Sequence, residues 1–177
     1  MPQTIARESV ALNRQSLEHA VRTAIAATVS VLVARLFKMP EAYWAAVTAM
    51  VVMQSTLGAS VSVSLLRLIG TAMGALAGGL LATYFGPNVY LFGAGVLLLG
   101  VLTAALHCDR SAFRFAGITL AIVMLVVRTA SPWLIAVHRF LEVSIGIVIA
   151  LVVTAIWPER PSTHASAAGA SAHAAPR

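Results

Sequence analysis

The fold prediction begins with the stretch Arg67-Leu-Ile-Gly-Thr-Ala-Met-Gly-Ala-Leu-Ala-Gly-Gly79. An arginine opens an apolar segment, and small residues then recur at every fourth position, at Gly70, Gly74 and Gly78. This spacing places a flat strip of glycine along one face of a helix, where a second helix can approach closely in a lipid bilayer. The stretch therefore predicts a membrane helix that packs through its glycines.

A similar pattern returns about 72 residues later. Arg139 again opens an apolar segment, and Gly146 follows it by seven residues, just as Gly74 follows the first arginine. The upstream segments Tyr43-Trp-Ala-Ala-Val-Thr48 and Arg114-Phe-Ala-Gly-Ile-Thr119 also echo each other. We interpret the chain as two copies of one unit, covering about residues 17–86 and 88–158.

Composition assigns this unit to a membrane. Of the 177 residues, 59% are hydrophobic and 10% are charged, whereas a soluble domain normally has about 25% charged residues. The apolar residues fall in long blocks with charges at their edges, which is typical of membrane spans. The net charge of +6 then indicates membrane orientation and anion handling rather than nucleic-acid binding. The one cysteine, Cys108, excludes an internal disulfide.

The apolar blocks predict an all-α integral membrane protein with six transmembrane helices. The blocks cover about 20–37, 42 to the polar stretch at 54–64, 66–85, 89–106, 114–128 and 137–157. The fifth is short, because the thirteen residues between Arg114 and Arg128 make about 20 Å of helix against a hydrocarbon core of about 30 Å. Residues 1–16 are expected to form a cytoplasmic lead-in and residues 159–177 a disordered cytoplasmic tail. Arg22 is expected to reach the interface at the start of the first span, and Trp44 to anchor the second.

Six spans place both termini on the same side of the membrane. By our count, that side carries eight lysines and arginines and the other side carries four. The positive-inside rule therefore places both termini in the cytoplasm. Because each copy has three spans, the second copy lies inverted relative to the first. Inverted repeats are a recurring transporter architecture, with the pathway at the interface between the copies.

Two interpretations of Arg67 remain open. Arginine at a helix start anchors the cytoplasmic end of a span, but this does not account for the glycine strip that follows it. The alternative is a functional charge inside the membrane. Arg139 lies on the face where the positive-inside rule disfavours arginine, and Glu142, one turn deeper, can pair with it. That pair is either structural or acts as a gate or a proton-titrating site.

The other polar residues within spans are Gln54, Thr48 and Thr119. Hydrogen bonding between helices explains each of them, and lining of a pathway is the alternative. Motifs of metalloproteases, phosphate loops and serine hydrolases are absent from the sequence, so we expect no enzyme, no cofactor and no metal.

These residues resemble a known family. Tyr43 to Thr48, Arg67 to Thr71 with Gly74, Arg139 with Gly146, and the closing Trp157-Pro158 are similar to the fusaric acid resistance (aromatic acid exporter) family of bacterial inner-membrane transporters. The pattern is also similar to the membrane part of plant aluminium-activated malate transporters. The resemblance covers about residues 17–160.

The resemblance implies a multi-pass inner-membrane block that exports organic anions such as aromatic carboxylates, as a carrier or a channel. Arginines attract the anion in the plant relatives, which points to Arg67 and Arg139 here. Bacterial members usually carry two such blocks and soluble domains, so we expect a homodimer to supply the second block. The rival hypothesis is a membrane scaffold or accessory subunit that keeps the helices without transport.

Overall fold

The computed structural model describes residues 2–54, 56–126 and 130–157, with side chains from residue 16 onward. The described chain is all helical and contains no strand, which confirms the predicted all-α class. Its helices are α1 (Pro2–Leu36), α2 (Tyr43–Val52), α3 (Leu57–Phe85), α4 (Val89–Ala105), α5 (Arg110–Leu125) and α6 (Pro132–Ile156). The predicted tail at 159–177 and Arg128 lie outside the described residues.

Three of the described helices are long and apolar enough to cross a membrane. They are Ser16–Leu36 within α1, Leu57–Phe85 and Pro132–Ile156. Helices α2 and α4 are apolar but have only 10 and 17 residues, and α5 has 16. Ten residues make about 15 Å of helix, so α2 is too short to cross a hydrocarbon core of about 30 Å by itself. Length and composition thus support three of the six predicted spans.

Helix α3 begins at Leu57, not near residue 66 as predicted. Thr56 caps its start, because the Thr56 hydroxyl accepts a hydrogen bond from the backbone N–H of Ala59 at 3.2 Å. The residues that we assigned to a polar connection are helical, and two of their serines, Ser60 and Ser64, are buried in the protein interior. Arg67 consequently lies ten residues inside the helix, about 15 Å from its start, and not at a helix end.

The other two long helices also begin earlier than predicted. Helix α6 starts at Pro132 rather than at residue 137, and Ser131 caps it by accepting a hydrogen bond from Leu134 N–H at 3.4 Å. Arg139 therefore lies about 10 Å inside α6. Helix α1 runs without interruption from Pro2, so the predicted lead-in at 1–16 continues into the first span as one helix.

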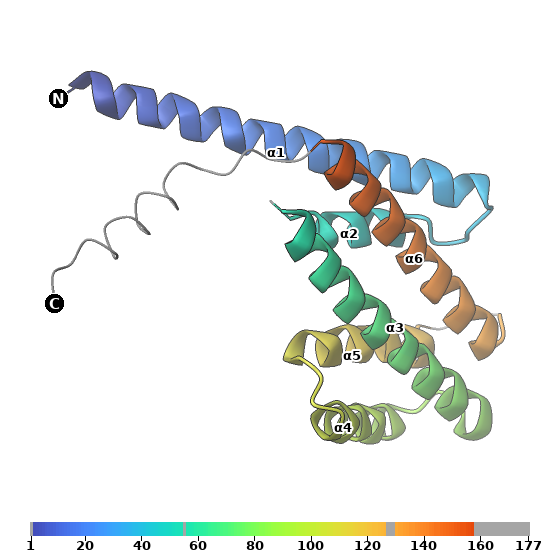
Figure 1. The fold of residues 1–177 in the computed structure, drawn as a ribbon. Helices are drawn as coiled ribbons and strands as arrows, with labels where there is room; N and C mark the ends of the chain where they lie inside the picture. The colour runs from blue at the N-terminus through green and yellow to red at the C-terminus, as the bar shows by residue number, and fades with distance from the viewer. Residues whose placement is uncertain (1, 55, 127–129, 158–177) are drawn as a thin grey trace, which may run out of the picture.

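Helices α3 and α6 lie side by side at the centre of the bundle and run in opposite directions (Figure 1). Helices α1 and α2 pack on α6, and we call these three the first group. Helices α4 and α5 pack on α3, and these form the second group. Each group combines helices from both predicted copies. Helix α3 of the first copy packs on α4 and α5 of the second, and α6 of the second copy packs on α1 and α2 of the first.

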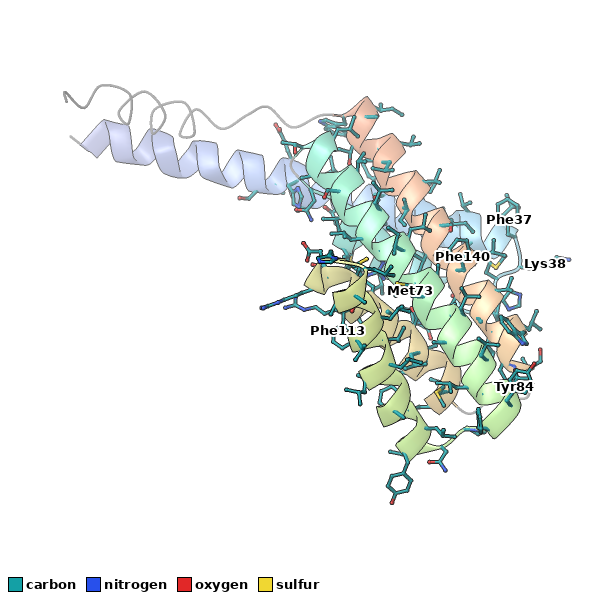
Figure 2. All side chains as sticks on the ribbon, turned by 60° about the horizontal axis from the view of Figure 1, so that its bottom comes forward. Phe37, Lys38, Met73, Tyr84, Phe113 and Phe140 are labelled. Atoms are coloured by element: carbon teal, nitrogen blue, oxygen red, sulfur yellow. The ribbon has the colours of Figure 1, made fainter. Side chains whose placement is uncertain are left out.

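Each group has an apolar core of its own. The core of the first group consists of Ala26, Ala49, Val52, Met53, Val143, Ile147 and Ala150. The core of the second group consists of Ala82, Leu99, Ala116, Leu120 and Met124, with Met73 and Phe113 packed against it (Figure 2). A smaller cluster of Ala75, Val123, Ile135 and Ala136 joins the two groups.

The glycine strip of α3 faces α5. A Cβ atom on Gly70 would collide with the carbonyl oxygen of Ala112, and a Cβ on Gly74 with that of Ala116. A Cβ on Gly78 would lie 2.9 Å from Cβ of Val123. The two helix backbones approach each other at these positions to a distance that only glycine permits.

Candidate functional site

Arg67 is buried where α3 meets α2 and α5. Its side chain is 5% exposed, and Nε donates a hydrogen bond to Oγ1 of Thr48 on α2 at 3.2 Å. Its guanidinium carbon lies 4.7 Å from the centre of the Phe115 ring on α5. Thr48 and Phe115 therefore fix the side chain through one hydrogen bond and one cation–π contact.

Within the described parts of the chain, the bond to Thr48 is the side-chain hydrogen bond that Arg67 makes, and no carboxylate lies within ion-pair distance of it. The two terminal nitrogens of Arg67 are not among the fully enclosed polar atoms that lack a partner. A buried charge without a counterion is strongly destabilising. A guanidinium group stays ionised at physiological pH and binds a carboxylate by donating two parallel hydrogen bonds. The arrangement is therefore suited to binding an anion that the described residues do not supply.

Arg139 is buried at the contact between α6 and α2, but it carries its own counterion. Its Nη1 atom lies 3.3 Å from Oε2 of Glu142, which is fully buried. The other oxygen of that carboxylate, Oε1, accepts a hydrogen bond from the backbone N–H of Glu41 at 3.1 Å. The guanidinium carbon lies 4.0 Å from the centre of the Trp44 ring. The predicted pairing of Arg139 with Glu142 is thus present, and it ties α6 to the start of α2.

The two arginines make matching contacts. Arg67 lies against Phe115 and Arg139 against Trp44, and these two aromatic residues occupy the same place in the two echoing segments of the sequence. On α2, Trp44 and Thr48 are one helical turn apart, so both arginines contact the same face of this short helix.

The glycines that follow the arginines match in the same way. A Cβ on Gly146 of α6 would collide with the carbonyl oxygen of Ala45, as one on Gly74 of α3 would with that of Ala116. Ala45 and Ala116 again hold the same place in the echoing segments. The second helix of each predicted copy is therefore packed against the third helix of the other, α2 against α6 and α5 against α3.

The two remaining predicted polar residues lie apart from the guanidinium groups. The Thr119 hydroxyl donates to the carbonyl oxygen of Phe115 in its own helix at 3.0 Å. Gln54 lies in the break between α2 and α3, where its backbone N–H donates to Oγ of Ser60 at 3.2 Å and its side chain to the carbonyl oxygen of Val51. Their place in a pathway stays a prediction.

Sequence reasoning missed the aromatic partners of the arginines and the role of Glu41. It placed Trp44 at the membrane interface, whereas the ring covers a guanidinium. The register between the echoing segments would have paired Trp44 with Phe115 and indicated a shared role. For Glu41 we find no such pattern in the sequence.

Arg22 was also predicted at the interface, and this was wrong. Its side chain is fully buried in the first group, with Nη2 lying 3.8 Å from Sδ of Met53. The Thr154 hydroxyl donates to the same sulfur at 3.2 Å. Among the residues with described side chains, no group of three or more His, Cys, Asp or Glu could hold a metal ion.

Comparison with known proteins agrees with the resemblance seen in the sequence. Residues 25–153 match the model of a family described as fusaric acid resistance protein-like. The uncharacterized transporter YdhK of Escherichia coli K12 is 35% identical over 149 residues, and that of Salmonella typhimurium is 31% identical. The inner membrane protein YeeA of Escherichia coli K12 is 31% identical over 158 residues. These matches cover 79% to 82% of this chain, but only 22% of YdhK and 42% of YeeA. Because the family match extends over most of the chain, the protein belongs to the fusaric acid resistance protein-like family.

Proposed function

We propose that this chain is the membrane block of an inner-membrane transporter or channel that moves organic anions, such as aromatic carboxylates, out of the cytoplasm. Two relatives carry the name transporter and one the name inner membrane protein, which supports this assignment. The observation that carries it is the buried Arg67, whose terminal nitrogens have no carboxylate partner in the described chain.

In this proposal the anion binds the terminal nitrogens of Arg67. The Thr48 hydroxyl accepts a hydrogen bond from Nε of Arg67, and the Phe115 ring covers one face of the guanidinium. A guanidinium fixed from two sides loses little freedom when it binds a carboxylate. Arg139, whose charge is paired with Glu142, does not contact the anion.

The proposal includes two inverted copies of a three-helix unit. The antiparallel course of α3 and α6 and the matching arginine and glycine contacts support it. Short apolar helices in corresponding positions of two copies are a recurring feature of binding sites in such transporters, and α2 and α5 hold those positions with 10 and 16 residues. The route would then pass between the two groups, beside Arg67.

We further propose that the chain acts as a homodimer with both termini in the cytoplasm. Large apolar side chains of α4 face outward, including Leu97, Leu98 and Val101. These are available to lipid or to a second copy.

Flux into proteoliposomes tests the proposal. The purified protein would be assayed with benzoate, salicylate, malate and succinate, with and without a pH gradient. Carboxylate flux above that of empty liposomes is the expected result, and its response to the gradient distinguishes a proton-coupled carrier from a passive channel. Absence of flux for the whole panel, from protein shown to be folded, would contradict the transport proposal.

The rival function is a scaffold or accessory subunit, and one observation favours it. The cavity of about 270 Å³ between α3 and α6 is lined by apolar side chains, and neither arginine is among them. The same is true of the cavity of about 200 Å³ near Pro87 and Pro132. A scaffold would retain its partner when Arg67 is replaced, whereas a transporter would lose flux.

A further inference from the structure

The two arginine sites share an aromatic contact and a following glycine, but their hydrogen bonds differ, because Nε of Arg67 donates to Thr48 and Nε of Arg139 has no partner among the described residues. They also differ at the third residue after each arginine. The third residue after Arg67 is Gly70, and the third residue after Arg139 is Glu142. The aromatic residue under each guanidinium and the glycine seven residues on are otherwise alike. Of the described part of the chain, only the second site contains a carboxylate paired with its arginine.

Glu142 uses both of its oxygens at the second site. Oε2 lies 3.3 Å from Nη1 of Arg139, and Oε1 accepts a hydrogen bond from the backbone N–H of Glu41 at 3.1 Å. The carboxylate is fully buried. It therefore neutralises the guanidinium where a carboxylate from outside the protein would otherwise bind.

The first site has no room for an equivalent side chain. A Cβ at position 70 would collide with the carbonyl oxygen of Ala112 and lie 2.9 Å from Cβ of Phe115. The close packing of α3 on α5 thus excludes a carboxylate at the position from which Glu142 acts. Arg67 is left with its Thr48 hydrogen bond and its aromatic contact.

We propose that Glu142 is a built-in counter-anion, which holds at Arg139 the place that an organic carboxylate takes at Arg67. Glu142 thereby confines anion binding to one of two equivalent arginine sites in each chain. This inference rests on the proposed function, because it takes Arg67 as the anion site. The inference gives Glu142 a role in specificity. At Arg139 a carboxylate of the protein itself occupies the position that the substrate carboxylate occupies at Arg67.

The test is the number of benzoate ions bound per chain, measured by equilibrium binding of radiolabelled benzoate to the purified protein in detergent. Four forms are compared: wild type, Arg67→Gln, Glu142→Gln, and the double variant with both changes. Glutamine at position 142 keeps an oxygen that can accept the Glu41 N–H bond, and it replaces the oxygen that faces Arg139 by an NH2 donor, so both the charge and the acceptor at Arg139 are removed.

One carboxylate binds per guanidinium in the two-bond geometry. We therefore expect one benzoate per chain in wild type, none in Arg67→Gln, two in Glu142→Gln, and one again in the double variant. Adding Arg139→Gln to Glu142→Gln should bring the number back to one. This last variant is the matched control, because it removes the freed arginine and leaves Arg67 intact.

The outcomes separate the two proposals. One site in wild type that is lost in Arg67→Gln, with no site gained in Glu142→Gln or in the double variant, overturns the role of Glu142 and leaves Arg67 as the anion site. Binding to Glu142→Gln that Arg67→Gln does not reduce overturns the Arg67 assignment instead. Absence of binding in every form overturns both.

A second measurement covers the case in which Glu142→Gln is too unstable for binding studies. An anion that binds the folded state raises the unfolding temperature. Benzoate should therefore raise the unfolding temperature of Glu142→Gln more than that of wild type, because it replaces the missing carboxylate at Arg139. An equal rise in both proteins overturns the inference.

Discussion

Oγ1 of Thr48 accepts a hydrogen bond from Nε of Arg67 at 3.2 Å, and this bond joins the two groups of helices. Thr48 belongs to α2 in the first group, and Arg67 to α3 in the second. On its other side, Cβ of Thr48 lies 2.7 Å from the position that a Cβ on Gly146 would take. Thr48 thus contacts both α3 and α6, the helices that carry Arg67 and Arg139.

Replacing Thr48 tests this contact. Thr48→Val keeps the shape of the side chain and removes the acceptor, which leaves the buried Nε of Arg67 unpaired. An unpaired buried donor costs about 1–3 kcal/mol, so we expect a lower unfolding temperature in detergent. Thr48→Ser keeps the hydroxyl and is the control. An unfolding temperature for Thr48→Val equal to that of wild type would show that the bond contributes nothing.

Close backbone contact predicts a penalty for alanine at two glycines. In Gly74→Ala and Gly146→Ala the new methyl group meets a backbone carbonyl oxygen, and overpacking of this kind costs about 1–3 kcal/mol. Gly117→Ala on α5 is the control, because a Cβ there would meet nothing within 4 Å. Thermal unfolding of the three variants measures the difference. If all three unfold at the same temperature, the helices are further apart than described here.

The cation–π contact between Arg67 and Phe115 predicts coupling between these residues. A double-mutant cycle with Arg67→Gln and Phe115→Leu should give a coupling energy of about 0.5–2 kcal/mol in thermal unfolding. Phe113, on the same helix, packs against the apolar core of the second group, so the cycle with Phe113→Leu should give coupling near zero. Equal coupling in the two cycles would argue against a specific contact.

The lone cysteine tests the proposed topology. Cys108 lies between α4 and α5 and is partly exposed. With six spans and both termini in the cytoplasm, this connection faces the cytoplasm. A membrane-impermeant maleimide should therefore label Cys108 in inside-out vesicles and not in intact spheroplasts. Lys38→Cys in a Cys108→Ser background is the control and should give the opposite pattern. Labelling of Cys108 in intact spheroplasts would show that the orientation is opposite to the proposed one.

The all-α class, the family and the pairing of Arg139 with Glu142 could be predicted from the sequence, because these features depend on composition and on spacing along one helix. The start of α3 was missed since Ser60 and Ser64 read as a polar connection, whereas in the fold their side chains face the interior and Ser60 accepts a bond from the α2–α3 break. Composition alone does not distinguish a serine in a loop from one on a packed helix face.

The aromatic partners of the two arginines could not be predicted from the sequence for a different reason. Trp44 and Phe115 contact Arg139 and Arg67 only because α2 packs on α6 and α5 packs on α3. Sequence order does not show which helices pack together, and the packing of α3 on α5 and of α6 on α2 is a property of the tertiary structure. The end of α2 at Val52, by contrast, lies next to the polar stretch that the sequence placed at 54–64.

The most direct test of the central claim is carboxylate flux through Arg67→Gln in proteoliposomes, compared with wild type and with Arg114→Gln. Arg114 is exposed on α5, so its replacement removes the same charge outside the buried site. We predict that Arg67→Gln loses flux while it remains inserted and folded, and that Arg114→Gln keeps it. Full flux through Arg67→Gln would contradict the account and remove the buried arginine from the transport route.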